Sequence, residues 1–136
     1  MAVSLDNLDP RFRRSVGGFM DCYLEQSTAG LDHVVTEDCT FQGAFAGGLL
    51  RGRKLIASHM QQTFRSVLSR GVVRYQTMVI AGSRIELRWE LYCPGERVAV
   101  STPGLSILDL DEHGLIQKIQ VQWDPSALTE WRNPVK

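Results

Sequence analysis

The sequence predicts an α+β domain in which helices come first and an antiparallel sheet follows. In the first half, apolar residues recur at helical spacing. From residue 72 to residue 124, apolar and polar residues alternate, and short turn sequences divide this part into consecutive strands. Separation of helices and strands along a chain is typical of the α+β class. The 136 residues suffice for a hydrophobic core, so we expect one domain over 1–136.

The first predicted helix begins at Asp9 and Pro10. Asp is a favourable N-cap, and Pro fits the first helical turn, where its missing N–H costs no hydrogen bond. One face of this helix, which runs to about residue 26, carries regularly spaced side chains that are apolar except for the last: Phe12, Val16, Phe19, Met20, Tyr23 and Ser27. We expect that face to cover the sheet.

Residues 27–69 predict short elements before one longer helix. We expect a short helix at 31–35, a short strand at 39–42 and a Gly-rich loop at 43–50. The glycines of that loop match no dinucleotide-binding or phosphate-binding pattern. A helix at 54–69 follows, and its apolar face includes Ile56, Met60 and Phe64, with His59 on the flank.

Four strands are expected at 72–81, 84–92, 97–110 and 115–124, the third with a kink at Pro103 and Gly104. The strand at 84–92 alternates strictly. Its two faces carry Arg84, Glu86, Arg88 and Glu90 on one side, and Ile85, Leu87, Trp89 and Leu91 on the other. Beyond the strands, Asp124 followed by Pro125 predicts a helical turn at 126–131.

The composition restricts the possible partners and the compartment. Fifteen basic and 15 acidic residues give a net charge of zero, which argues against nucleic acid and anionic membranes as partners. The sequence has no apolar run of membrane-spanning length and no signal-peptide pattern at 1–9. Three widely spaced cysteines show no metal-binding spacing. We therefore expect a cytoplasmic protein with no metal site and no cofactor.

Four stretches, in this order, resemble the nuclear transport factor 2-like superfamily. They are residues 34–41, 51–56 and 107–116, and Trp123 with Asp124. The resemblance extends to its SnoaL-like, ketosteroid isomerase-like and limonene-epoxide hydrolase-like members. It implies a SnoaL-like domain over the whole chain, with a curved antiparallel sheet wrapped around the N-terminal helices into a cone. It also implies an apolar pocket for a small-molecule substrate or ligand, and a homodimer, which zero net charge does not oppose.

The catalytic residues of these relatives transfer only in part. The ketosteroid isomerase positions fall near Phe19, Gly43 and Ser106, which cannot move a proton as that reaction requires. Arg88 and Glu90 match the Arg-x-Asp positions of the epoxide hydrolases, although the third position falls on an apolar residue. The resemblance thus implies Glu90 as proton acceptor with Arg88 orienting it. The alternation of the strand favours instead a charged outer face.

Other residues are candidates for the pocket. His59 could transfer a proton near neutral pH, or could be a half-buried residue on a helix flank. Asp124 could lie at the pocket rim, or cap the turn that follows it. Phe19 and Tyr23 could line the pocket or pack in the core. The residues expected to contact substrate are Phe19, Tyr23, Phe41, Val121 and Trp123.

These observations lead to three functional hypotheses. The first is a cofactor-independent acid–base enzyme acting on a small apolar molecule, as an isomerase, cyclase, dehydratase or epoxide hydrolase of secondary metabolism. The second is a non-catalytic ligand-binding protein of the same fold. The third, a protein-interaction module, has little support because the pattern shows no exposed aromatic patch. Fold alone does not decide among them.

Overall fold

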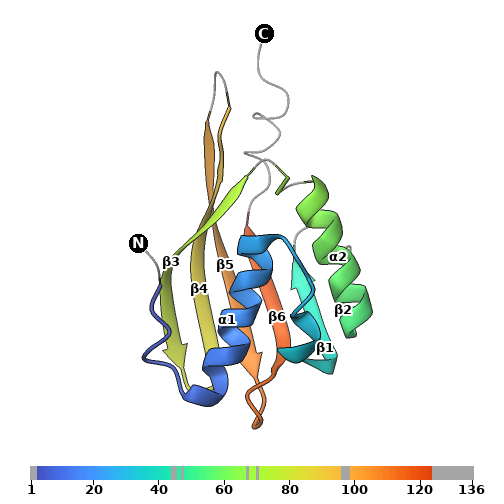
Figure 1. The fold of residues 1–136 in the computed structure, drawn as a ribbon, viewed down its shortest axis with the longest axis vertical. Helices are drawn as coiled ribbons and strands as arrows, with labels where there is room; N and C mark the ends of the chain where they lie inside the picture. The colour runs from blue at the N-terminus through green and yellow to red at the C-terminus, as the bar shows by residue number, and fades with distance from the viewer. Residues whose placement is uncertain are drawn as a thin grey trace.

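Helices and a curved sheet form two layers in the computed structural model, which describes residues 3–43, 46, 48–66, 68–69, 71–95 and 99–123. The described helical elements are α1 (Pro10–Glu25), the 3₁₀ turn η1 (Leu31–His33) and α2 (Arg53–Ser66). The strands are β1 (Val35–Gly43), β2 (Leu50–Arg51), β3 (Val72–Ala81), β4 (Arg84–Cys93), β5 (Val100–Leu110) and β6 (Ile116–Trp123). In Figure 1, α1 lies in front of the sheet and α2 lies beside β1. The predicted α+β class is confirmed.

The six strands are ordered β2-β1-β6-β5-β4-β3. Strands β3 to β6 form an antiparallel meander, as the alternation predicts. Strand β1, however, pairs in parallel with β6, so the sheet is mixed rather than wholly antiparallel. Side-chain alternation has the same period in both kinds of pairing, so it could not reveal the direction of this pair.

Helix α1 matches its prediction at both ends. Asp9 is the N-cap, and its Oδ1 accepts a hydrogen bond from the Arg11 backbone N–H at 2.9 Å. At the other end Gln26 takes a left-handed conformation with φ 52° and ψ 49°. Its side-chain Nε2 donates to the Leu68 carbonyl oxygen at 2.6 Å. The end of α1 is thereby tied to the segment that follows α2.

The short elements differ most from expectation. The helix expected at 31–35 is the single turn η1, because the β-branched Val34 and Val35 favour extended structure. The strand expected at 39–42 is longer, and the two-residue strand β2 was not expected. Helix α2 ends at Ser66 rather than 69. The predicted helical turn at 126–131, Asp124, and part of the Gly-rich loop lie outside the described residues.

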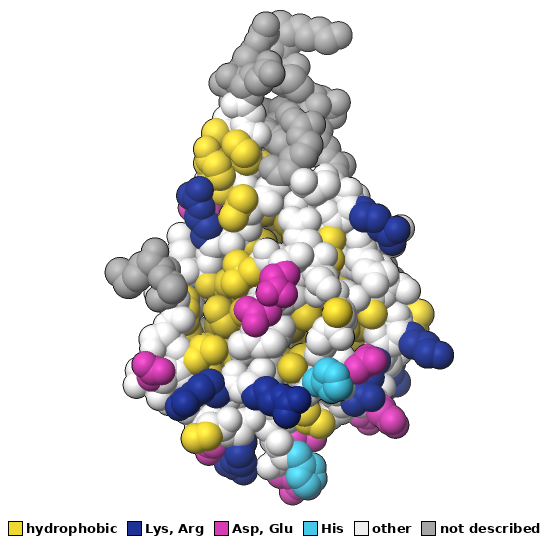
Figure 2. Space-filling view, viewed as in Figure 1, with side chains coloured by type: hydrophobic (Ala, Val, Ile, Leu, Met, Phe, Trp, Pro, Cys, Tyr) yellow, Lys and Arg dark blue, Asp and Glu magenta, His cyan; other side chains and the backbone are white. Residues whose placement is uncertain are grey.

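The hydrophobic core lies between α1, α2 and the inner face of the sheet. On β4, the inner residues Ile85, Leu87, Trp89 and Leu91 are each 7% exposed or less. Acidic and basic side chains are interspersed on the face of the molecule seen in Figure 2. Among the described helices, none is both long and apolar enough to cross a membrane.

Candidate functional site

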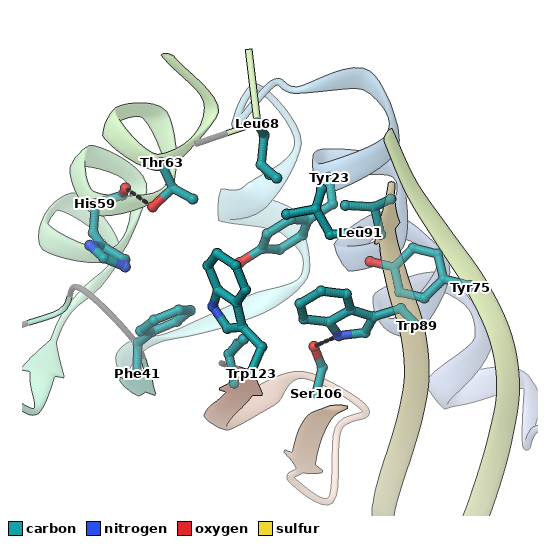
Figure 3. Close-up of a pocket in the computed structure, with 12 residues that line it drawn as sticks. Tyr23, Phe41, His59, Thr63, Leu68, Tyr75, Trp89, Leu91, Ser106 and Trp123 are labelled. Atoms are coloured by element: carbon teal, nitrogen blue, oxygen red, sulfur yellow. Dashed lines mark hydrogen bonds between the residues drawn. The ribbon is translucent and has the colours of Figure 1, made fainter. Parts of the chain in front are cut away.

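An apolar pocket lies where the two helices meet the inner face of the sheet (Figure 3). Its walls enclose about 500 Å³ of atom-free space if the open mouth is included, but the cavity itself has a volume of only about 30 Å³. That is room for roughly one or two water molecules, so a larger ligand requires side chains of the wall to move. The lining residues are Tyr23, Phe41, His59, Thr63, Leu68, Val73, Tyr75, Trp89, Leu91, Ser106, Val121 and Trp123.

Aromatic rings form much of the wall. The ring of Tyr23 contacts Phe64 edge-on, with 5.5 Å between the ring centroids. The centroids of Phe41 and His59 are 5.1 Å apart. Across the floor, the indoles of Trp89 and Trp123 lie 6.2 Å apart. Such walls suit a ligand with flat or ring-shaped apolar surface.

Gly104 makes room for the indole of Trp89. In the sheet it is the neighbour of Trp89 on one side and of Trp123 on the other. A Cβ atom at this position would overlap the six-membered ring of Trp89. At the predicted kink, β5 pairs with β4 through Pro103 and Gly104 without a register shift, and the missing side chain of the glycine lets Trp89 lie across β5.

The Trp89 indole makes a buried hydrogen bond. Its Nε1–H donates to Ser106 Oγ at 2.9 Å. On α2, Thr63 Oγ1 donates to the His59 carbonyl oxygen at 3.0 Å, so the hydroxyl hydrogen of Thr63 is already bonded to the helix backbone. These two bonds satisfy part of the polar lining within the protein.

Three other polar groups of the lining have no hydrogen-bond partner among the described residues: the hydroxyls of Tyr23 and Tyr75 and the imidazole of His59. Burial raises the pKa of both tyrosine hydroxyls well above the ordinary value of 10. Burial lowers the pKa of His59 from its ordinary 6.5. Near neutral pH the pocket therefore presents two phenolic O–H donors and a neutral imidazole that can accept a proton.

The structure brings most of the sequence-predicted residues to this pocket. Tyr23, Phe41, Val121, Trp123 and His59 all line it. Phe19 does not line it. This side chain is fully buried in the core, where its ring contacts that of Tyr23 at 5.3 Å between centroids.

Arg88 and Glu90 lie on the outer face of the sheet, so the expected acid–base pair inside the pocket is not found there. Buried Leu87 and Trp89 occupy the inward positions of β4, and alternation turns their neighbours outward. The β4–β5 ladder runs without a register shift, so no slip reverses the faces. Glu90 pairs instead with Arg74, at 3.9 Å.

Tyr75, Trp89 and Ser106 line the pocket but were not predicted as site residues. Tyr75 has the same parity as buried Val73 on β3, which was the available signal. The alternation along β4 predicts the inner face for Trp89, but it does not show that this face lines a pocket. Ser106 falls near a ketosteroid isomerase position, but its hydroxyl cannot replace the residue that this reaction requires. No group of three or more His, Cys, Asp or Glu side chains within the described ranges could hold a metal ion.

The curved open sheet, covering helices and internal pocket define a member of the nuclear transport factor 2-like superfamily. The chain belongs to the SnoaL-like domain family, whose sequence model matches residues 16–119. In a comparison with curated proteins, no sequence matched.

Several solved structures share the fold. One from Jannaschia sp. CCS1, named a SnoaL-like polyketide cyclase, has a TM-score of 0.74 and 12% identity, over 96% of this chain and 99% of its own. A steroid delta-isomerase from Pseudomonas aeruginosa has a TM-score of 0.72 and 17% identity, over 93% of this chain and 90% of its own. A protein from Catenulispora acidiphila with a ketosteroid isomerase-like fold, in complex with trimethylamine, has a TM-score of 0.66 and 15% identity, over 83% and 87%. At these identities the likeness concerns the fold.

Proposed function

We propose that this protein is an acid–base enzyme that needs no cofactor and acts on a small, mostly apolar carbonyl compound in the pocket. The observation that carries the proposal is the pocket's set of polar groups without a described partner: one imidazole and two phenolic hydroxyls among aromatic walls. Polar groups placed at a few points of an apolar cavity are what orient a ligand in small-molecule sites.

The protonation states of these groups are complementary to enolisation. His59 is neutral near pH 7 because burial lowers its pKa, so an imidazole nitrogen can take a proton from the carbon beside the carbonyl. The C–H electron pair moves into the new C=C bond, and the carbonyl π electrons move to oxygen. Tyr23 and Tyr75 keep their protons and can donate hydrogen bonds to that oxygen as its charge develops.

The enolate has two possible fates. Where a C=C bond is conjugated with the enolate, return of the proton from His59 to the γ-carbon isomerises the substrate. Attack of the enolate carbon on a second carbonyl closes a ring, and the alkoxide formed there takes the proton back from His59. Both belong to the isomerase and cyclase classes expected from the family resemblance, and the names of the cyclase and isomerase structures of the same fold support this range. The apolar wall excludes water from the reacting atoms, which strengthens the interaction with the developing oxyanion.

Hydrogen–deuterium exchange tests the proposal without knowledge of the natural substrate. The α-hydrogens of 1-indanone, a bicyclic ketone, are followed by NMR in deuterated buffer with and without the protein. We expect the protein to accelerate exchange, and His59→Gln to reduce the acceleration by about 100-fold or more. His33→Gln is the matched control, because His33 is exposed on η1 and does not line the pocket.

Two results would contradict the enzyme proposal. The first is exchange of this and other cyclic ketones that is no faster with the protein than without it. The second is full acceleration by His59→Gln that is folded as judged by circular dichroism, which would exclude His59 as the base.

A non-catalytic ligand-binding protein is the alternative. It is favoured by the absence of a described hydrogen-bond partner for the His59 ring, because catalytic histidines are usually oriented by a third group. Tryptophan fluorescence would follow binding, since Trp89 and Trp123 both line the pocket. Saturable binding of 1-indanone with no accelerated exchange favours this alternative. Trimethylamine is a useful second ligand, because aromatic walls also attract cations.

The homodimer expected from the sequence stays a prediction. We propose the outer face of the sheet as its contact surface, because Arg84, Glu86, Arg88 and Glu90 alternate in charge along β4. Two such faces can meet with opposite charges aligned. Sedimentation velocity of the protein and of Arg88→Glu tests this, and a monomeric wild-type protein would contradict it.

A further inference from the structure

The floor of the pocket contains a serine whose hydrogen-bonding direction is fixed by its neighbour. The indole Nε1–H of Trp89 can only donate, so Ser106 Oγ must be the acceptor of their 2.9 Å bond. A serine hydroxyl carries one hydrogen of its own. Among the described residues, the Ser106 hydroxyl donates no hydrogen bond in return.

Ser106 lines the pocket, so a molecule bound there can accept this hydrogen. Ser106 lies in the middle of the sheet, between Leu87 of β4 and Val121 of β6, and only 3% of it is exposed. Its remaining surface borders the pocket, where it lies beside the Trp89 ring (Figure 3). A buried donor without an acceptor is costly, so a ligand that supplies an acceptor is favoured over one that does not.

The orientation of Ser106 depends in turn on Gly104. A Cβ atom at position 104 would overlap the Trp89 ring, so the glycine allows the indole to lie where its N–H reaches Ser106. Gly104, Trp89 and Ser106 thus form a series on two adjacent strands, in which the first makes room, the second orients and the third remains free to donate.

We propose that Ser106 is the specificity-determining donor that recognises an oxygen atom of the pocket ligand, with Trp89 as its positioning residue. The inference rests on the proposed function for the class of ligand, a carbonyl compound. The new element is a binding preference. Between two molecules of the same shape, the pocket should bind more tightly the one whose carbonyl oxygen reaches Ser106 at the floor. Thr63 cannot provide this selection, because its hydroxyl hydrogen is bonded to the His59 carbonyl oxygen.

Binding of a matched pair of probes tests this directly. The probes are 1-indanone and indane, which differ in one carbonyl oxygen, and the dissociation constants are measured by NMR titration. We expect Ser106→Ala to reduce the preference for the ketone by about fivefold, as loss of one hydrogen bond implies. Ser58→Ala is the control, because it removes an exposed serine hydroxyl of α2 that does not line the pocket, and it should leave the preference unchanged.

A second pair of variants protects the test against a folding defect. Ser106→Ala leaves the buried Trp89 N–H without its acceptor, whereas Trp89→Phe with Ser106→Ala removes both partners and is expected to fold. This double variant is compared with Trp89→Phe alone, which retains the hydroxyl but not its orientation. The preference for the ketone should be lower in the double variant than in Trp89→Phe, and lower in Trp89→Phe than in wild type.

The outcomes separate this inference from the proposed function. An equal preference for the ketone in wild type, Ser106→Ala and the double variant would overturn the role of Ser106, whether or not exchange is catalysed. A preference that depends on Ser106, without accelerated exchange, would support the role of Ser106 and contradict the enzyme proposal.

Discussion

The ten residues of strand β4 (Arg84–Cys93) form two faces of opposite character. Its inner face is apolar and buried, and at Trp89 and Leu91 it forms part of the pocket. Its outer face carries Arg84, Glu86, Arg88 and Glu90, all exposed or half-buried. Although the family resemblance implies catalytic roles for Arg88 and Glu90, the inner face determines how the strand lies.

The energies of the two faces explain this outcome. Burying a large apolar side chain contributes about 1.5–3 kcal/mol, whereas an exposed ion pair contributes about 0–1 kcal/mol. Turning β4 over would place Ile85, Leu87 and Trp89 in water and two charged pairs in the core. The proposed proton transfer in the pocket therefore relies on side chains of other elements, such as His59 on α2 and Tyr23 on α1.

The largest expected difference in stability is between variants of two adjacent residues on opposite faces of β4. Leu87→Ala removes a fully buried side chain, and we expect the free energy of unfolding to fall by about 2–5 kcal/mol. Arg88→Ala, one residue further on and exposed in the single chain, should change the free energy of unfolding of the separate protomer by less than about 0.5 kcal/mol. Urea denaturation measures both. Similar losses in the two variants would show that the outer face is also buried, for instance in a dimer.

A smaller effect is expected where the inner face is shaped by a glycine. Gly104→Ala forces the Trp89 ring to move, and we expect a loss of about 1–3 kcal/mol together with a shifted tryptophan emission spectrum. Gly30→Ala is the control, because no described atom lies within 4 Å of a Cβ atom there. An unchanged spectrum in Gly104→Ala would mean that the indole is not held across Gly104.

The pH dependence of stability should report the burial of the His59 imidazole. Burial lowers the pKa of His59, so at pH values below its ordinary 6.5 the unfolded chain binds a proton here more readily than the folded protein. This residue therefore makes the protein less stable as the pH falls from about 7 to about 5. We expect His59→Gln to lose less stability over that interval than wild type, as measured by urea denaturation. Ser58→Ala, exposed on the same helix, is the control, and a steeper loss in His59→Gln would contradict the burial of the imidazole.

The smallest expected effect lies on the outer face. Glu90→Gln removes an ion pair with Arg74 that is 3.9 Å long and partly exposed, so the loss of stability should be below about 0.5 kcal/mol. Exchange of 1-indanone should proceed at the wild-type rate, since Glu90 lies on the face turned away from the pocket. Loss of exchange in a folded Glu90→Gln protein would contradict this prediction and show that the Glu90 carboxylate is needed for catalysis.

Much of the fold could be predicted because its signals are local. The cap at Asp9, the helical spacing of α1 and the alternation of β4 each lie within a short stretch. The parallel pairing of β1 with β6 could not be predicted, because it joins residues far apart in the sequence. The pocket could likewise be predicted only where its residues have local signals. Tyr23 and Trp123 follow from periodicity, whereas the free donor of Ser106 depends on an indole from the neighbouring strand.

Strand β6 is the last described strand in the chain, yet it lies inside the sheet between β1 and β5. On the ribosome, the β1–β2 pair and the β3–β5 meander can form early, but nothing in the strand ladder joins them until residues 116–123 have emerged. Until then both groups expose an unpaired edge, and such edges invite association between nascent chains. Completion of the sheet is therefore a late and long-range step, which is slow compared with local pairing. The yield of folded protein on expression should therefore depend on how quickly β6 is synthesised and pairs with β1 and β5.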